Sequence, residues 1–326
     1  MKKIMLADLR QGVEKEIACF EEKFLACMPC GDDTIGALTK HVLSQKGKRL
    51  RPLISFLVAK VCSGVSEATY RAAIILELLH TASLVHDDVL DESSLRRGKP
   101  TINRIWGNKT AILFGDYIYG KCLQLIETQE DFDLLPIYSK IARELPQGEL
   151  LQKELSDSQS YEEKAYFDVI DRKTASLFGA SAYVGAKTAE SKEDYSNSAE
   201  RFGRLLGRAF QIQDDILDFD LSCKSGKGFG NDIKERKITL PLIFLLQTLE
   251  EKERKRLLDF LALEQKSEDS IKALIESVGE YGCLKKAQEQ VAYYSLEAKK
   301  ALLDLPNNEF REKLGQLTDC LIGREL

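Results

Sequence analysis

Proline and histidine are scarce in this chain, and apolar runs long enough to cross a membrane are absent. Its 326 residues include only seven prolines and three histidines, whereas 44% are hydrophobic and 30% are charged. A hydrophobic content this high excludes an intrinsically disordered chain. The richest apolar window, Ala72 to Val85, contains Glu77 and His80 and is shorter than the roughly 20 apolar residues of a spanning helix. We expect no transmembrane segment.

A leader sequence and a disulfide pattern are also missing. The first residues include two lysines, but charged residues from Asp8 to Glu16 interrupt any apolar stretch. The eight cysteines are spread through a chain too long to depend on disulfides, and Cys27 and Cys30 have no second pair to complete a zinc site. We therefore expect a cytoplasmic protein with reduced thiols. The net charge of −5 argues against nucleic acid as a partner, so phosphate binding would depend on local basic clusters.

The distribution of apolar residues predicts an all-α fold. Apolar residues recur at helical spacing between the few prolines, and alternating patterns typical of strands are scarce. The stretch from Ala72 to Val85 is apolar almost all round and predicts a central buried helix, and a second helix is expected from about Phe202 to Phe219. We expect a loop over residues 222–237 and an outer layer of amphipathic helices over about the last 80 residues.

Two acidic motifs with the pattern DDxxD lie at the ends of these two helices, at residues 87–91 and 214–218. Residues four apart share one face of a helix, so Asp87 with Asp91, and Asp214 with Asp218, direct two carboxylates toward one point. Such oxygen ligands, with room left for water and phosphate, suit Mg²⁺ rather than zinc. A single motif is often a solvated helix end, but two beside buried helices require cations. We predict two magnesium half-sites that a diphosphate completes.

Four basic clusters accompany the acidic motifs. They begin at Lys46, Arg96, Lys173 and Lys227, and the last extends to Lys237. Each alone is typical of a solvated surface. Together with the acidic pairs they predict a site for two phosphorylated substrates, one bridged by metal and one bound directly by arginine and lysine.

Over nearly its whole length the chain resembles the trans-isoprenyl diphosphate synthases, the polyprenyl synthetase family. The similar segments are KGKRLRP (46–52), ELLHTASLVHDDVLDESSLRRGKPT (77–101), DRKTASLFGASA (171–182), FQIQDDILDF (210–219) and GKGFGNDIKERKITLP (226–241). Lys46 and Arg236 stand where glycine is usual in the family. The resemblance implies one isoprenoid synthase domain over residues 1–326, with about ten or more helices around a deep central cavity, and a homodimer.

The resemblance also implies roles for individual residues. The metal ligands, shared with an allylic diphosphate, would be Asp87 and Asp91 for two Mg²⁺ ions and Asp214 for a third, supported by Asp88, Asp215 and Asp218. The cations that hold the allylic diphosphate would be Arg96, Lys173, Lys227 and Lys237. The residues that hold isopentenyl diphosphate would be Lys48, Arg51, His80 and Arg97. Thr174 and Gln211 would face the reacting carbons and, with Lys173, form the catalytic set.

The implied reaction joins isopentenyl diphosphate head to tail, in trans, to the allylic diphosphate. Residues four and five before Asp87 are Ser83 and Ala82, whereas family members that stop at short products tend to place a bulky aromatic residue there. We therefore expect an open tunnel and a product of roughly C30 to C50, as in quinone side chains.

Four alternatives remain open. A farnesyl or geranylgeranyl diphosphate synthase would use the same site with a shorter tunnel. A metal phosphohydrolase of the HD type is suggested by His86 and Asp87 with His41 and His80 upstream, but it leaves the second DDxxD unexplained. A terpene cyclase would have no use for the cluster at residues 46–52, and a non-catalytic partner subunit usually has eroded acidic motifs.

Overall fold

The computed structural model describes residues 6–29, 31–45, 47–128, 132–158, 161–221 and 229–323. The helices within these ranges are α1 (Leu6–Leu9), α2 (Glu14–Cys27), α3 (Thr34–Ser44), α4 (Leu50–Cys62), α5 (Glu67–Leu90), α6 (Ile102–Trp106), α7 (Asn108–Thr128), α8 (Leu135–Ser158), α9 (Glu163–Ile170), α10 (Ser176–Lys187), α11 (Ser196–Asp218), α12 (Asn231–Lys234), α13 (Leu240–Thr248), α14 (Glu251–Ala262), α15 (Glu268–Glu280), α16 (Cys283–Ala301) and α17 (Glu309–Gly323). The predicted all-α class is confirmed.

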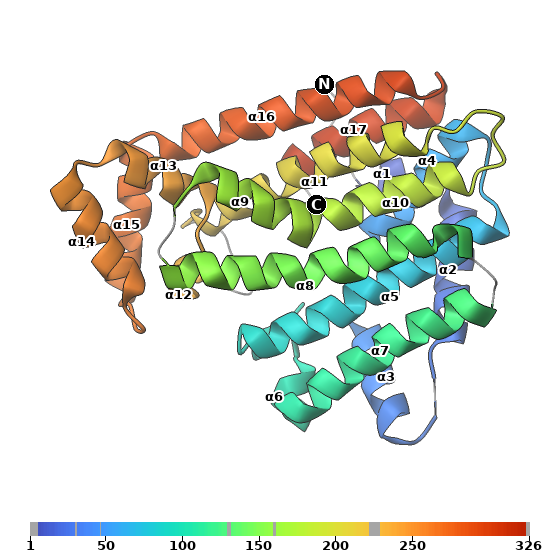
Figure 1. Cartoon of the computed structure of the whole chain (residues 1–326), viewed down its shortest axis with the longest axis horizontal. Helices are drawn as coiled ribbons and strands as arrows, with labels where there is room; N and C mark the ends of the chain where they lie inside the picture. Colours follow the sequence, from blue (N-terminus) through green and yellow to red (C-terminus); the bar gives the residue numbers. More distant parts are fainter. Residues whose placement is uncertain are drawn as a thin grey trace.

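Short segments connect these helices. They are the 3₁₀ turns η1 (Phe132–Leu134) and η3 (Leu302–Asp304), the π-helical turn η2 (Asp171–Ala175), and the strands β1 (Leu95–Arg96) and β2 (Lys99–Pro100). Figure 1 shows α16, α11, α10, α8, α5 and α7 lying along the long axis of the molecule, with α14 and α15 at one end. No helix in the described part of the chain is long and apolar enough to span a bilayer; the cytoplasmic location stays a prediction.

Helix α5 contains the predicted apolar stretch and ends at the first acidic motif. A capping box starts it: the Ser66 hydroxyl accepts from the Thr69 amide, and the Thr69 hydroxyl accepts from the Ser66 amide. Ala72, Leu76 and Leu79 are buried in the larger hydrophobic core. Because the helix is fixed at its start and along its length, Asp87 and Asp91 are held at its far end.

Helix α11, which ends at the second acidic motif, lies unusually close to α10 and η2. A Cβ on Gly203 would lie 2.4 Å from the Phe178 carbonyl oxygen, and one on Gly207 would lie 2.6 Å from the Ala175 Cα. Any larger residue at these positions would push the helices apart. The two glycines therefore set the distance between η2 and the end of α11.

The structure differs from the sequence prediction in two places. Residues 95–100 form a two-stranded hairpin whose turn residues, Arg97 and Gly98, both have positive φ, as type I′ turns require. Within the predicted loop, residues 231–234 are helical because the Asp218 carboxylate accepts from the amides of Asn231 and Asp232 at the start of α12. Among the amphipathic C-terminal helices, α16 packs directly on α11.

Candidate active site

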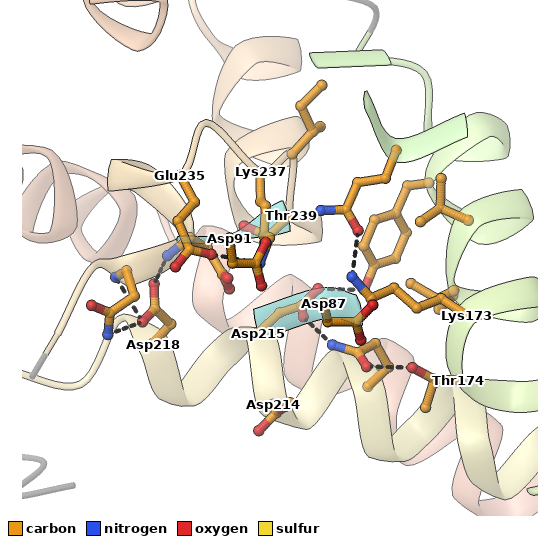
Figure 2. A pocket seen from close by; sticks show the side chains of 18 of the residues that line it. Asp87, Asp91, Lys173, Thr174, Asp214, Asp215, Asp218, Glu235, Lys237 and Thr239 are labelled. Carbon is orange, nitrogen blue, oxygen red and sulfur yellow. Dashed lines mark hydrogen bonds and ion pairs between the residues drawn. The ribbon is translucent and has the colours of Figure 1, made fainter. Parts of the chain in front are cut away.

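Both acidic motifs line one cavity of about 490 Å³ between α5, α9, η2 and α11. Figure 2 shows carboxylates from the two motifs extending from separate helices, with Lys173 on one side and Lys237 on another. The cavity wall also has an apolar part, formed by Leu84, Leu155, Val169 and Ile170. The cavity thus combines a concentration of acidic groups with a surface suited to hydrocarbon.

The first motif supplies Asp87 and Asp91 to this cavity. Burial raises the pKa of Asp87 to about 7, and the nearby Glu149 carboxylate adds to the effect. The Asp91 carboxylate forms an ion pair with Lys237, with 3.2 Å between Oδ2 and Nζ. Asp88 is buried instead, and its carboxylate accepts from the Arg96 Nε at 2.7 Å.

The three carboxylates of the second motif lie in three different environments. Asp214 is exposed and lines the cavity. Asp215 is buried, and burial raises its pKa to about 7. Asp218 also lines the cavity while it caps α12, with amide-to-carboxylate distances of 2.9 Å from both Asn231 and Asp232.

A chain of side-chain hydrogen bonds connects η2 to the second motif (Figure 2). The Thr174 hydroxyl donates to the Gln211 Oε1 at 2.7 Å, and the Gln211 Nε2 donates to the Asp215 Oδ1 at 2.8 Å. The buried Tyr166 hydroxyl donates to the other oxygen of Asp215 at 2.6 Å. Both oxygens of Asp215 are therefore engaged by neutral donors, which suits a supporting carboxylate better than a direct metal ligand.

The described cations predicted to hold the allylic diphosphate each contact a carboxylate. Lys173 lies 2.6 Å from Glu149, Arg96 lies 2.7 Å from Asp88, and Lys237 contacts both Asp91 and Glu235. Burial opposes the charge of Lys237, but Asp91 and Glu235 outweigh it and raise its pKa. Lys227 lies outside the described residues.

Arg236, the departure from the family's usual glycine, has a φ of 59°. This left-handed conformation explains why glycine is usual there, because a glycine adopts it without strain. The Arg236 side chain lies 3.9 Å from Glu264 and lines a smaller neighbouring cavity, not the one with the acidic motifs.

A second, basic pocket adjoins the first and shares Leu84 and Arg96 with it. His80 and Arg97, which the sequence analysis assigns to the second diphosphate, line this pocket. Arg51 lies near His80. Burial lowers the pKa of His80 well below its usual value, and the positive charges of Arg51 and Arg97 lower it further. The Arg51 Nε is buried and has no hydrogen-bond partner among the described residues. Arg51 and Lys48 line none of the described cavities, and Lys48 is exposed.

The donor set fits magnesium. Among the described residues, no group of three or more histidine, cysteine, aspartate or glutamate side chains converges closely enough to hold a metal by itself. Burial disfavours the charged forms of Asp87 and Asp215 and raises the pKa of each, and a divalent cation bound nearby would favour the ionised carboxylates.

The three histidines do not meet. The His86 Nε2 lies 3.1 Å from the Ile112 carbonyl oxygen on α7, whereas the His41 Nε2 lies 2.8 Å from the Pro100 carbonyl oxygen. His80 lies in the basic pocket. Because these side chains diverge, the HD-type phosphohydrolase alternative loses its metal-binding histidines.

Sequence reasoning assigned no role to four polar residues of the site. Glu149 of α8 pairs with Lys173, and Tyr166 of α9 donates a hydrogen bond to Asp215. Arg49 pairs with the buried Glu77 at 2.7 Å, and both residues line the basic pocket. A cation partner for Glu77 could have been expected, because a glutamate inside an apolar helix requires one. Nothing in the local sequence distinguished Glu149 or Tyr166.

Comparisons with known proteins identify a family model, relatives and a solved structure that are similar to this chain. Residues 32–278 match the family model described as polyprenyl synthetase. The chain is 36% identical over 292 residues to the all-trans-nonaprenyl-diphosphate synthase (geranyl-diphosphate specific) of Rhodobacter capsulatus. This alignment covers 88% of each chain. It is 33% identical over 295 residues to the octaprenyl diphosphate synthase of Escherichia coli, covering 89% of this chain and 90% of that one. A crystal structure of polyprenyl synthase from Caulobacter crescentus complexed with calcium and isoprenyl diphosphate matches over 100% of both chains, with a TM-score of 0.90 and 31% identity.

Proposed function

This chain belongs to the polyprenyl synthetase family of all-trans prenyltransferases, and from that premise we propose that it condenses isopentenyl diphosphate onto an allylic diphosphate, head to tail. The product is a long-chain polyprenyl diphosphate, of the kind that serves as a quinone side chain. The observation that carries this proposal is one cavity lined by both acidic motifs and by apolar wall, with a basic pocket beside it. We also propose that residues 1–326 form a single domain, because the structural relative aligns over all of both chains.

In this proposal Asp87 and Asp91 hold two Mg²⁺ ions and Asp214 holds a third, with Asp88, Asp215 and Asp218 in support. When bound, the ions neutralise negative charge on the departing diphosphate. The structure of the Caulobacter relative is described as a complex with calcium and isoprenyl diphosphate, which supports the binding of a divalent cation together with a prenyl diphosphate.

The chain's own cations bind and orient the two substrates. Lys173, Arg96 and Lys237 exchange their present carboxylate partners for the allylic diphosphate, whose C–O bond breaks. The new C–C bond forms to isopentenyl diphosphate, and the proton that this substrate loses passes to the released diphosphate. No strong protein base is required. Thr174 and Gln211, fixed by their mutual hydrogen bond, face the reacting carbons.

The decisive experiment is mass analysis of the products made from farnesyl and isopentenyl diphosphates with Mg²⁺. We expect polyprenyl diphosphates of roughly C30 to C50, and no product without the metal. A product that ends at C20 would favour the short-chain alternative. Release of inorganic phosphate without C–C bond formation would contradict the proposed reaction.

The basic pocket yields a prediction about isopentenyl diphosphate. Arg51→Ala should raise the Michaelis constant for this substrate about tenfold or more and leave that for the allylic substrate nearly unchanged, because we assign its cation to the metal-free diphosphate. Arg51 lies near His80, and its buried Nε has no hydrogen-bond partner among the described residues. Lys48→Ala should act in the same direction but more weakly, since Lys48 is exposed.

Initial rates with each substrate varied separately measure this difference. Lys255→Ala serves as the control, because Lys255 is exposed on α14 and lines none of the described cavities. Equal increases in both Michaelis constants for Arg51→Ala would contradict the assignment of the pocket.

We propose that the chain is a homodimer that associates through α7. Ile112, Leu113 and Leu123 of this helix are 44%, 68% and 64% exposed, and Ile105 of the neighbouring α6 is 48% exposed. Grouped apolar side chains of this size are typical of protein interfaces. Leu113→Asp should produce monomers by light scattering, whereas Leu303→Asp, at an equally exposed leucine of η3, should not. A monomeric wild type would contradict the proposal.

A further inference from the structure

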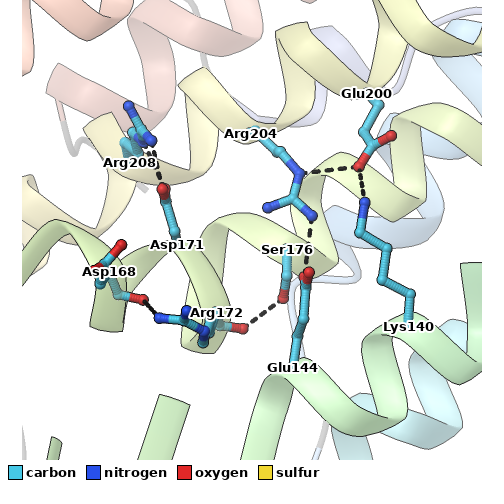
Figure 3. Close-up of polar contacts among 9 residues, drawn as sticks. All are labelled: Lys140, Glu144, Asp168, Asp171, Arg172, Ser176, Glu200, Arg204 and Arg208. Atoms are coloured by element: carbon cyan, nitrogen blue, oxygen red, sulfur yellow. Dashed lines mark hydrogen bonds and ion pairs between the residues drawn. The ribbon is translucent and has the colours of Figure 1, made fainter. Parts of the chain in front are cut away.

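The π-helical turn η2 is tied to α11 at a point outside the cavity. The Arg208 Nε donates to the Asp171 Oδ1 at 2.5 Å, and the Arg208 Nη2 donates to the other carboxylate oxygen. Figure 3 shows the two side chains meeting between their helices. Neither residue lines a described cavity. Their side chains are only 29% and 25% exposed, so this pair is less solvated than a typical surface salt bridge.

The Arg208 guanidinium is also fixed by aromatic rings. It lies 5.9 Å from the ring centroid of Phe167 on α9 and 5.3 Å from that of Tyr294 on α16. The hydrogen bond to Asp171 raises the pKa of Arg208 against the opposing effect of burial. A planar cation that lies over two rings and is joined to both oxygens of one carboxylate is restricted in its orientation.

The geometry of η2 determines where two site residues point. Lys173 and Thr174 lie within this turn and line the cavity. π-Helical turns are rare and less favourable than continuous α-helix, so they persist where surrounding contacts hold them. Helix α11 supplies two such contacts three residues apart, Arg208 to Asp171 outside the cavity and Gln211 to Thr174 inside it. Gly207, which precedes Arg208, permits the close approach of α11 to η2.

We propose that Asp171 and Arg208 are positioning residues for the allylic diphosphate: their ion pair holds η2 in register with α11, so that Lys173 and Thr174 face the second acidic motif. This inference rests on the proposed function, and it assigns a role to two residues that do not touch the substrate. The isopentenyl pocket is lined by residues of α2, α3, α5, α6 and the 95–100 hairpin but by none of η2 or α11, so the ion pair should not affect it.

The chain offers a matched control one turn earlier on α11. Arg204 donates to Glu144 of α8 and to Glu200, each at 3.0 Å, and Lys140 completes this cluster (Figure 3). The Arg204 side chain is 26% exposed and lines no described cavity. Arg204 thus matches Arg208 in charge, helix and burial, but it contacts α8 and not η2.

Amide hydrogen exchange and steady-state kinetics of Asp171→Asn, Arg208→Gln and Arg204→Gln test the proposal. In the first two variants we expect exchange over residues 171–176 to accelerate about tenfold. The Michaelis constant for the allylic substrate should rise about fivefold or more, and that for isopentenyl diphosphate should change less than about twofold. Arg204→Gln should change neither the exchange over residues 171–176 nor the Michaelis constant for the allylic substrate, even if it lowers the melting temperature as much as the other two variants do.

Two further variants separate positioning from charge. Arg208→Lys retains the charge but cannot form the planar two-point contact, so it should show most of the loss. The double variant Asp171→Asn/Arg208→Gln should be no worse than either single change, since each breaks the same contact.

Unchanged exchange over residues 171–176 in Asp171→Asn would overturn the inference, as would equal increases in both Michaelis constants. Failure of the proposed function would look different, because wild-type protein would then form no C–C bond. In that case the exchange measurement, together with calorimetric binding of inorganic diphosphate in the presence of Mg²⁺, still decides whether the ion pair positions Lys173.

Discussion

Turnover should fall at least about a hundredfold when Asp87 or Asp214 is replaced with alanine. The two carboxylates line the same cavity from α5 and α11, and each is assigned to ions that neutralise the departing diphosphate. Single-turnover rates at saturating substrates and Mg²⁺ measure the effect on the chemical step. A folded variant that kept more than about a tenth of the wild-type rate would show that its assigned metal role is wrong.

Two controls separate this loss from misfolding. Asp259→Ala removes an exposed acid of α14 that lines none of the described cavities, and its rate should stay within about twofold of wild type. Burial raises the pKa of Asp87 to about 7, above its value in the unfolded chain, so at pH 8 its charge opposes folding. Asp87→Ala should therefore melt at the same temperature as wild type or higher at that pH.

Ser83→Phe should shift the product distribution from roughly C30 to C50 down to about C20 or less, while the first condensation continues. Ser83 is half-buried one turn before Asp87, and the neighbouring Leu84 lines the cavity. Below it on α5 come the buried Leu79 and Leu76, and each helical turn advances about 5.4 Å. A phenyl ring at Ser83 would block the growing chain after a few units. Chromatography of the extracted products measures the shift.

Ser83 is a sharper test than Ala82. Ala82 is fully buried in the hydrophobic core, so a phenylalanine there would overpack the helices and cost about 1–3 kcal/mol of stability. Ser83→Ala is the matched control, because it removes the hydroxyl without adding volume and should keep the wild-type distribution. An unchanged distribution from active Ser83→Phe, or a wild type that ends at C15, would contradict the assignment of this position.

The predictions that succeeded rest on local properties of the chain. Helix α5 and the end of α11 were predicted because apolar residues recur with the helical period, which depends only on neighbours in the sequence. The spacing of Asp87 and Asp91 similarly placed both carboxylates toward one cavity. The family followed from motifs that retain their order and residue types.

The sequence by itself thus determined the helical class, the two acidic motifs and the family. Only the tertiary structure decided which partners these residues meet: Glu149 beside Lys173, Tyr166 on Asp215, and Lys48 outside the pocket that Arg97 lines. It also decided that η2 is a π-helical turn held by Arg208, 37 residues after Asp171. The physical reason is that such contacts depend on how closely distant helices pack, which local periodicity does not specify.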